Sequence, residues 1–428
     1  MPTPPDLSTT RTEIGGIPVG DLAREFGTPT FVYDAAVIRR RLGELAAFDV
    51  VRYAQKACSN LAILDLVRRH GALVDAVSAM EIRRALAAGY TAADYTTESS
   101  PPPIVYTADI FDTDALELCI QHDLHVNCGS ADMIDQLGVR TPDREITLRI
   151  NPGFGHGHSQ KTNTGGKQSK HGIWHDQIGQ CLVRAEPHRL RVTGLHMHIG
   201  SGTDLEHLSQ LCGAMEKAAR EVGDSITSIS AGGGLPTVYK AGDQYVDLEA
   251  YYTLWNTTRG RLQEDFGHPI RLEIEPGRYL AAESGYLVAE IRAVKQQDDN
   301  TFYLLDAGFN NLARPILYGA YHPMAIVPSD GDTGRPEQEV IVGGPLCESG
   351  DIFTQEEGGF VSKRMLPEAK VGELLVIGCA GAYSSVMSSN YNSRPLAAEV
   401  LIQEGRAALI RKRQTFEDIV RGESIPEW

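Results

Sequence analysis

The feature that most constrains the fold is a regular alternation of apolar, strand-like runs with amphipathic, helix-like stretches across residues 50–280. Parallel strands that are buried on both faces form continuous apolar runs, and their alternation with helices is typical of βαβ units. Eight such strand starts predict a (β/α)8 barrel of the TIM type. The expected strands are VVRYAQK, LVDAVS, IVYTADI, HVNCGS, EITLRINP, LRVTGLHMHIG, ITSISAGGG and RLEIEPGRYL.

The alternation stops near Tyr286, after which strands follow one another without long helices. EVLIQ and AALIRKR are joined by residues 404–406, a short Gly-containing connection typical of a hairpin. This half therefore predicts a mainly antiparallel β domain. Before the barrel we expect a strand over residues 30–33 and a helix over 35–48 with Asp34 as its N-cap.

The chain has 428 residues and exceeds the size at which a single hydrophobic core stops growing, so two domains are expected. We expect a barrel over residues 35–285 that binds the cofactor inferred below. Residues 1–34 and 286–428 are expected to form the β domain, which would complete the substrate site and the dimer interface.

Charge and cysteine content exclude several classes of function. The formal net charge of −16 argues against nucleic acid or an anionic membrane as a partner, because phosphate groups would be repelled. Seven cysteines without a C-x-x-C pair suit neither a disulfide framework nor a zinc site. The N-terminus lacks the pattern of a signal peptide and no run is long enough for a membrane helix, so a cytoplasmic protein is expected.

Chemistry in barrel enzymes gathers at the C-terminal ends of the strands. The first strand is followed by Lys56, the sixth ends in the run HMHIGS at 196–201, the seventh in the glycines of 231–234, and the eighth in the run EPGR at 275–278. Loops after the seventh and eighth strands form the usual phosphate site of this fold, and glycines there let backbone N–H groups approach a phosphate.

The two histidines of the sixth strand end, His196 and His198, are two residues apart, so their side chains point to the same face of a strand. One interpretation is a pair of metal ligands, as in metal-dependent hydrolases. Such a site needs further ligands, whereas the neighbouring strand ends offer glycines and a lysine. The other interpretations are an imidazole lying against a planar cofactor and two ordinary core histidines.

A lysine, a phosphate cradle, a carboxylate and a partner for a planar ring together indicate pyridoxal 5'-phosphate. Lys56 would form the Schiff base, the glycines would hold the phosphate, and Glu275 would pair with the pyridine nitrogen. Four separate strand ends agree in this assignment.

The same residues carry a resemblance to a known family. The chain resembles the diaminopimelate decarboxylases, fold type III pyridoxal-phosphate enzymes that are related to alanine racemase and to the eukaryotic-type ornithine decarboxylases. The resemblance covers nearly the whole chain, through AQKACSN, NPGFGHGHSQKTNTGG, SKHGIW, GLHMHIGSG, AGGGL, EIEPGR, ARPILYGAYH, GPLCESGD, GAY and SSNYNSRP.

The resemblance implies roles for individual residues. Lys56 would carry the cofactor, His198 would stack on its ring, and Glu275 would meet the pyridine nitrogen. The phosphate and the rest of the cofactor would be contacted by Ser201, Gly234, Gly277, Arg278 and Tyr383. The resemblance also implies a homodimer with shared active sites, in which Cys347, Glu348 and Tyr383 cross the interface.

The implied reaction is decarboxylation of meso-2,6-diaminopimelate to L-lysine and CO2, the last step of lysine biosynthesis. Cys347 would return a proton to the Cα atom. The substrate has an amino-acid group at each end, so its distal end needs partners for a carboxylate and an ammonium group. We expect these from Arg278, Arg314, Tyr318, Glu348 and Tyr383.

Three other functions remain open from the residues: a metal-dependent barrel hydrolase, a non-catalytic regulator on the same scaffold, and a decarboxylase of another amino acid. The presence of both Lys56 and Cys347 weighs against the regulator, and the pair of Arg314 and Glu348 favours a substrate with both charges at its far end. The chain departs from the family pattern at Met80, Cys379 and Ala380. The long loop at 151–173 is rich in Gly, Asn and Ser and is a candidate functional loop.

Overall fold

The computed structural model describes residues 4–91, 100–155, 164–198, 200 and 204–428. The chain forms two compact units. The first contains residues 39–236 and 244–280, and the second contains residues 3–38, 237–243 and 281–428. Each unit has its own main sheet.

The first unit is a closed barrel of eight parallel strands, which confirms the predicted fold class. Neighbouring strands pair in chain order, and the ring closes where the last strand pairs with the first through Glu273 and Val50. The strands are β4 (Val50–Ala54), β5 (Leu73–Ala76), β6 (Ile104–Ala108), β7 (His125–Cys128), β8 (Glu145–Asn151), β10 (Arg191–Met197), β11 (Ser228–Ser230) and β12 (Arg271–Ile274).

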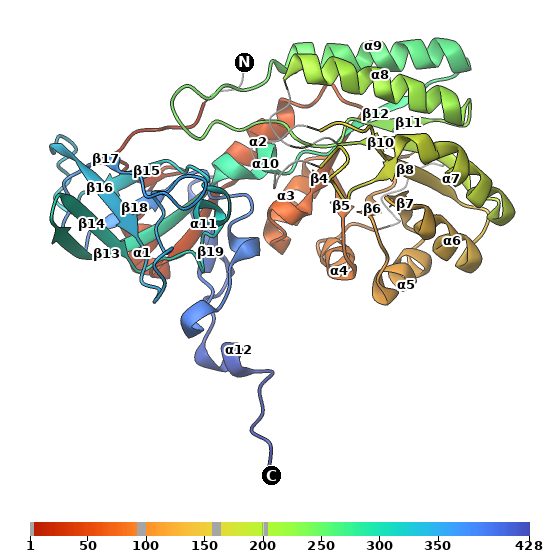
Figure 1. Ribbon diagram of the computed structural model, residues 1–428. Coiled ribbons are helices and arrows are strands. Elements are labelled where there is room, and N and C mark those ends of the chain that lie inside the picture. Colours follow the sequence, from red (N-terminus) through yellow and green to blue (C-terminus); the bar gives the residue numbers. More distant parts are fainter. Residues whose placement is uncertain (1–3, 92–99, 156–163, 199, 201–203) are drawn as a thin grey trace. The chain divides into compact units, whose positions relative to one another are not determined.

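Helices surround these strands on the outside of the barrel (Figure 1). Side chains of Asn60, Ser78, Asp112, Asp204 and Asp247 accept backbone N–H groups at the starts of five of them, which begins each helix at a defined residue. The barrel helices are α3 (Leu61–Arg69), α4 (Ala79–Ala87), α5 (Thr113–Gln121), α6 (Ala131–Arg140), α7 (Ile178–Ala185), α8 (Leu205–Val222), α9 (Leu248–Phe266) and α10 (Arg278–Ala281).

The second unit is built on a mixed, mainly antiparallel sheet in the order β17-β16-β14-β13-β3-β19-β20, with β18 pairing β13 and β15. The β14–β16 and β19–β3 pairs are parallel and the others are antiparallel. The strands are β3 (Thr30–Asp34), β13 (Gly285–Gln297), β14 (Asn300–Leu305), β15 (Met324–Val327), β16 (Glu337–Gly343), β17 (Arg364–Pro367), β18 (Leu374–Ile377), β19 (Ala398–Gln403) and β20 (Arg406–Arg411).

The core of the second unit joins segments from both ends of the chain. Helix α1 (Val19–Phe26) buries Val19 and Leu22 against valines and isoleucines of the sheet, among them Val32 and Val400. Side chains that alternate along a strand place one face of a sheet on the core, and burial of each such residue contributes about 1.5–3 kcal/mol. The N-terminal segment up to residue 38 is therefore an integral part of the β unit.

Several elements differ from the sequence-based expectations. Helix α2 (Ala35–Gly43) ends five residues earlier than predicted, while Asp34 does accept the backbone N–H of Ala36 at its start (2.8 Å). Several elements were not predicted from the sequence: the short strands β1 (Glu13–Ile14), β2 (Ile17–Pro18) and β9 (Ile173–Trp174), the strands β15 and β17, and the helices α1, α11 (Arg314–Tyr318) and α12 (Phe416–Val420). The described helices include none with the length and apolarity that a bilayer crossing requires.

Two glycines let backbone segments of the β unit cross. A Cβ atom on Gly285, at the start of β13, would lie 2.2 Å from the Cα atom of Gly381, and one on Gly381 would lie 1.8 Å from the carbonyl oxygen of Ala281. Ala380 also donates a backbone hydrogen bond to Gly285 (2.7 Å). Neither position has room for a side chain unless the backbone moves.

The substitution Gly285→Ala should therefore lower the free energy of unfolding by about 1–3 kcal/mol, the usual cost of overpacking. Denaturant unfolding measured by circular dichroism tests this expectation. The control is Gly213→Ala on the exposed face of α8, where a Cβ atom meets nothing within 4 Å and where alanine should stabilise the helix by about 0.5–1 kcal/mol. Equal stability of the two variants would contradict the crossing argument.

Candidate active site

Closure of the barrel places the end of the first strand beside the end of the last. The backbone N–H of Ala54 donates to the carbonyl oxygen of Pro276 (3.2 Å), and a Cβ atom on Gly277 would lie 3.1 Å from the carbonyl oxygen of Ala54. Lys56 follows β4 in a single 3-10 turn, η1 (Gln55–Ala57), and its side chain is exposed. The turn that contains Lys56 therefore follows directly on a backbone contact with the EPGR segment, although more than two hundred residues separate them in the chain.

The glycines after β11 form a second wall of the site. A Cβ atom on Gly233 would lie 2.6 Å from the carbonyl oxygen of Glu275, and one on Gly234 would lie 2.2 Å from that of Gly200. Gly232 and Gly234 have positive φ angles of 63° and 103°. Only glycine allows this backbone to pass so close to both neighbouring strand ends. Because glycine has no side chain, the peptide groups here remain accessible to a ligand.

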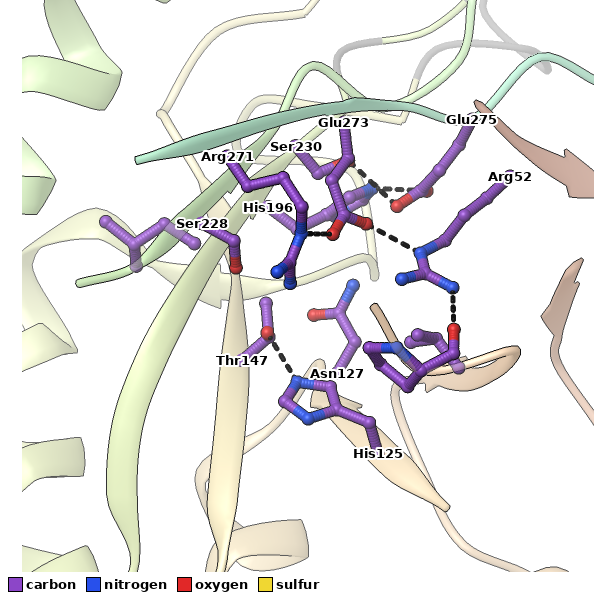
Figure 2. A pocket seen from close by; sticks show the side chains of 13 residues that line it. Arg52, His125, Asn127, Thr147, His196, Ser228, Ser230, Arg271, Glu273 and Glu275 are labelled. Atoms are coloured by element: carbon purple, nitrogen blue, oxygen red, sulfur yellow. Dashed lines mark hydrogen bonds and ion pairs between the residues drawn. The ribbon is translucent and has the colours of Figure 1, made fainter. Parts of the chain in front are cut away.

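Glu275 is buried and both oxygens of its carboxylate are held. Nε2 of His196 donates to Oε2 (2.8 Å) and Oγ of Ser230 donates to Oε1 (2.8 Å), as Figure 2 shows. Burial would raise the pKa of the Glu275 carboxyl, but these two interactions and the charge of Arg52 lower it below the ordinary 4.5. The fold stabilises the ionised form, and this contribution is present above pH 4.5 and is lost as the pH falls below that value.

Below Glu275 the barrel interior is polar rather than apolar. The guanidinium of Arg52 donates to Glu273 (2.6 Å) and to the carbonyl oxygen of Pro102 (2.5 Å), and Arg271 donates to the other oxygen of Glu273 (2.7 Å). These groups line a cavity of about 30 Å³ together with His125, Asn127 and Thr147 (Figure 2). Burial would raise the pKa of Glu273, but the two arginines lower it, so that this carboxylate also remains ionised.

Two further carboxyl groups lie near the lysine. Burial and the charge of Glu275 raise the pKa of Asp75, at the end of β5, while Lys56 opposes the rise. Burial also raises the pKa of Glu81, on α4, to about 7, with an added contribution from Asp75. The carboxylate of Glu81 accepts the backbone N–H of Val77 (2.9 Å). Carboxyl groups with pKa values near neutrality can exchange protons at physiological pH.

His198 lies just past the end of β10. Burial and the positive charges of Lys56 and Arg149 lower its pKa well below 6.5, so its imidazole is neutral. Its Nδ1 atom is buried and has no hydrogen-bond partner among the described residues. A neutral ring without a polar anchor on that nitrogen suits contact with a flat, aromatic ligand.

These residues fit the cofactor that the sequence predicts. The donor set combines an exposed primary amine, a neutral imidazole, a bare glycine backbone and an anionic carboxylate at one end of one barrel. A pyridine ring with a protonated nitrogen needs the carboxylate, and a phosphate needs backbone N–H groups. The geometry therefore accommodates pyridoxal phosphate without any change of residue type.

The β unit contains the residues that were predicted to bind substrate, except Arg278, which belongs to the barrel unit. Arg314, on α11, is buried and donates through Nη1 to Nε2 of His322 (2.9 Å) and to the hydroxyl of Tyr239 (3.2 Å). Nδ1 of His322 in turn donates to the carbonyl oxygen of Gly378 (3.0 Å), so the tautomer of the ring is defined. Tyr318 ends the same helix and is half-buried.

Cys347 and Glu348 are exposed in the turn that follows β16. The side chain of Asn392 accepts the backbone N–H of Cys347 (2.7 Å), and Asn392 itself has a left-handed φ of 53°. Tyr383 has a φ of 56° and is half-buried. Non-glycine residues adopt such angles only when the surrounding structure holds them there, which is frequent at functional sites.

The barrel brings together Lys56, His198, Gly234, Glu275 and Gly277, with Arg278 as the first residue of α10. The β unit holds Arg314, Tyr318, Cys347, Glu348 and Tyr383. Ser201 lies outside the described residues, as does the central part of the loop at 151–173, residues 156–163.

Sequence reasoning missed three groups of the site: the link between His196 and Glu275, and the carboxyls of Asp75 and Glu81. The position of Asp75 at the end of a strand could have indicated it from the sequence.

Two of the positions at which the chain departs from the family pattern differ in their surroundings: Met80 is exposed, whereas Cys379 is buried and has a φ of 52°. Within the described part of the chain, no group of three or more His, Cys, Asp or Glu side chains could hold a metal ion.

Known proteins resemble the chain over nearly its whole length. Residues 36–282 match the family model described as pyridoxal-dependent decarboxylase, pyridoxal binding domain. Diaminopimelate decarboxylase of Escherichia coli K12 is 52% identical over 419 residues, which cover 97% of this chain and 99% of that protein.

Solved structures give the same result. A crystal structure of diaminopimelate decarboxylase has a TM-score of 0.90 at 52% identity and covers 94% of this chain and 95% of the other. The Helicobacter pylori enzyme complexed with L-lysine has a TM-score of 0.82 at 29% identity and covers 94% of this chain and 98% of the other.

The charged pair inside the barrel yields a stability prediction. Replacing Arg52 with methionine would leave Glu273 buried with one cation fewer, so the free energy of unfolding should fall by about 3–5 kcal/mol. The double variant with Glu273→Leu should recover much of this loss, because no unpaired carboxylate remains. Urea unfolding of both variants tests the expectation, and a double variant no more stable than the single one would contradict it.

Proposed function

The chain belongs to the pyridoxal-dependent decarboxylases, and we propose that it converts meso-2,6-diaminopimelate to L-lysine and CO2, the last step of lysine biosynthesis. One observation carries the proposal: an amine, a neutral imidazole, a glycine cradle and an ionised carboxylate meet at the strand ends of a barrel that matches diaminopimelate decarboxylases from end to end. The L-lysine in the Helicobacter pylori structure is the product that this reaction would give.

Pyridoxal phosphate, when bound, supplies an acceptor for the electron pair that remains when the carboxylate leaves Cα. Lys56 would hold the cofactor covalently, and His198 would lie against its ring. Gly234 and Ser201 would contact the phosphate, together with the peptide groups around Gly277. The anionic carboxylate of Glu275 would keep the ring nitrogen protonated, which is supported by the depressed pKa of that carboxyl.

The carboxyl groups near Lys56 would exchange protons with its amine. Lys56 must be neutral to attack a carbonyl and must take up a proton when it is displaced. The raised pKa values of Asp75 and Glu81 favour carboxyl groups that can give and accept a proton near neutrality. Cys347, whose side chain is exposed, would return the proton to Cα after CO2 has left.

Substrate recognition would use the charges of the β unit. Arg314 would bind the distal carboxylate, helped by Arg278, and Glu348 would pair with the distal ammonium group. Tyr318 and Tyr383 would donate hydrogen bonds. Support comes from the setting of Arg314, which is buried and whose guanidinium is oriented by its hydrogen bonds to Tyr239 and His322.

We further propose a homodimer with shared sites, in which the β unit of one subunit completes the site and the interface of its partner. The exposure of Cys347 and Glu348 favours this assembly. The β unit also exposes large apolar side chains, including Phe360 and Val361, which an interface would bury. A cytoplasmic location is proposed as well, because all seven cysteines are free thiols, as expected in a reducing compartment.

A decarboxylase of another amino acid is the second candidate, since the cofactor residues would be the same. Arg314 and Glu348 favour diaminopimelate, because a simple diamine precursor has no distal carboxylate.

The direct test is release of CO2 from meso-diaminopimelate by the purified protein. The variant Lys56→Ala should lose activity by about 10²–10⁴-fold, since it loses both the covalent anchor and the amine that exchanges protons. Lys217→Ala, an exposed lysine of α8, is the matched control and should keep full activity. Undiminished turnover by Lys56→Ala, or turnover of ornithine or arginine alone, would refute the proposal.

The shared site can be tested by mixing variants. Lys56→Ala and Cys347→Ala should each be inactive, but after subunit exchange about half of the dimers are mixed and contain one intact site, so about a quarter of the activity should return. Lys56→Ala mixed with Glu275→Gln is the control. Both changes affect the barrel, so no intact site can form. Failure of the first mixture to regain activity after verified exchange would contradict shared sites.

A further inference from the structure

Glu275 is held by a histidine that has no other described partner. Nε2 of His196 lies 2.8 Å from Oε2 of Glu275, and Nδ1 of His196 is buried and makes no hydrogen bond to any described residue. A buried polar atom without a partner is costly, and histidines in cores usually use both nitrogens. The single bond of His196 is therefore directed at Glu275.

The bond also defines the proton on the ring. Glu275 is ionised and can only accept, so the hydrogen is on Nε2 of His196. Oγ of Ser230 donates to the other oxygen of the carboxylate (2.8 Å), which leaves Glu275 no freedom to rotate. The two donors come from β10 and β11; β11 pairs with β12, the strand that Glu275 follows, and β10 pairs with β11.

We propose that His196 is a positioning residue that fixes the orientation and the ionised state of the Glu275 carboxylate, and that it acts on the cofactor only through this carboxylate. The proposal rests on the proposed function, in which Glu275 meets the ring nitrogen. The first histidine of the H-x-H pair would then be neither a metal ligand nor the ring that stacks on the cofactor, but the residue that positions Glu275.

The charged surroundings of Glu275 show why one donor matters. Arg52, on β4, is a fixed cation on the same side, but its guanidinium is already bound to Glu273 and to Pro102. Asp75, on β5, adds a negative charge that interacts with Glu275, and Lys56 interacts with Asp75. Among these groups, His196 is the one that donates a hydrogen bond directly to the Glu275 carboxylate.

A matched control is available in the same cavity. His125, on β7, also lines the cavity of about 30 Å³, and its Nε2 pairs with Oγ1 of Thr147 (2.8 Å) instead of with Glu275 (Figure 2). A histidine that merely fills the barrel would be equivalent at either position. Replacement of His125 should therefore leave Glu275 unchanged if His196 has the role proposed.

The test uses the holoenzyme and four variants. His196→Leu removes the donor, and His196→Asn places its shorter amide near the position of Nδ1 and cannot replace Nε2–H. His196→Gln retains a donor near Nε2, and His125→Gln is the control. Two quantities are followed against pH: the ¹³C signal of the Glu275 carboxyl, assigned with Glu275→Gln, and the absorption spectrum of the bound cofactor.

Loss of the donor should raise the pH at which Glu275 titrates by about 1–3 units, because burial is then less opposed. The spectral transition of the cofactor should move upward with it. His196→Gln should move both midpoints less than His196→Leu, and His125→Gln should move neither.

The outcomes separate the two proposals. An unchanged carboxyl titration in both His196→Leu and His196→Asn would overturn the role of His196, and so would equal shifts in the His196 and His125 variants. If His196→Leu does not fold, His196→Asn alone decides. A shifted carboxyl titration with an unchanged cofactor spectrum would support His196 as the residue that positions Glu275, while it would refute the contact between Glu275 and the ring.

Discussion

The pairing of β12 with β4 is the constraint on which the site depends. It joins residues about 220 positions apart, through Glu273 with Val50 and Ile274 with Val51, and it continues beyond the strands in the bond from Ala54 to Pro276. Only this closure brings the segment that contains Lys56, after the first strand, next to the segment that contains Glu275, after the last. The eight-stranded ring thus joins the two groups that the proposed cofactor needs, an amine and a carboxylate, from the first and the last strand of the barrel.

The interior of the closed barrel contains charged side chains, which are costly to bury. A ring of eight strands must be filled by side chains, and here part of the filling is charged: Arg52, Glu273 and Arg271 lie below Glu275. Buried charges stabilise a fold poorly compared with apolar side chains of similar volume. Their presence is understandable if the field inside the barrel keeps Glu275 ionised, since an apolar filling would raise the pKa of that carboxyl instead.

Sequence patterns were sufficient for the barrel because each strand is a β-branched, apolar run bounded by turn residues, and both of its faces are buried. They were insufficient for short elements such as β9, which has two residues, and for the end of α2 at Gly43. A hydrophobic period can be recognised only over a longer stretch of sequence than either of these offers. Strand ends could be located, so the positions of Lys56 and Glu275 in the barrel could be predicted. The partner of His196 could not be found, because it lies 79 residues away and the contact depends on the register of three strands.

Contacts between distant residues also could not be predicted in the β unit. The orientation of Arg314 depends on Tyr239 and His322, and no local sequence pattern links these residues to it. Tyr239 comes from residues 237–243, a segment inserted between barrel elements in the sequence but packed with the β unit. His322 accepts from Arg314 only because its other nitrogen donates to Gly378. If His322 were protonated it could not accept this bond, so the arrangement requires a neutral ring. Tyr239 and His322 thereby fix the direction in which the guanidinium of Arg314 points, and a planar guanidinium with a fixed orientation can bind a carboxylate through two parallel hydrogen bonds.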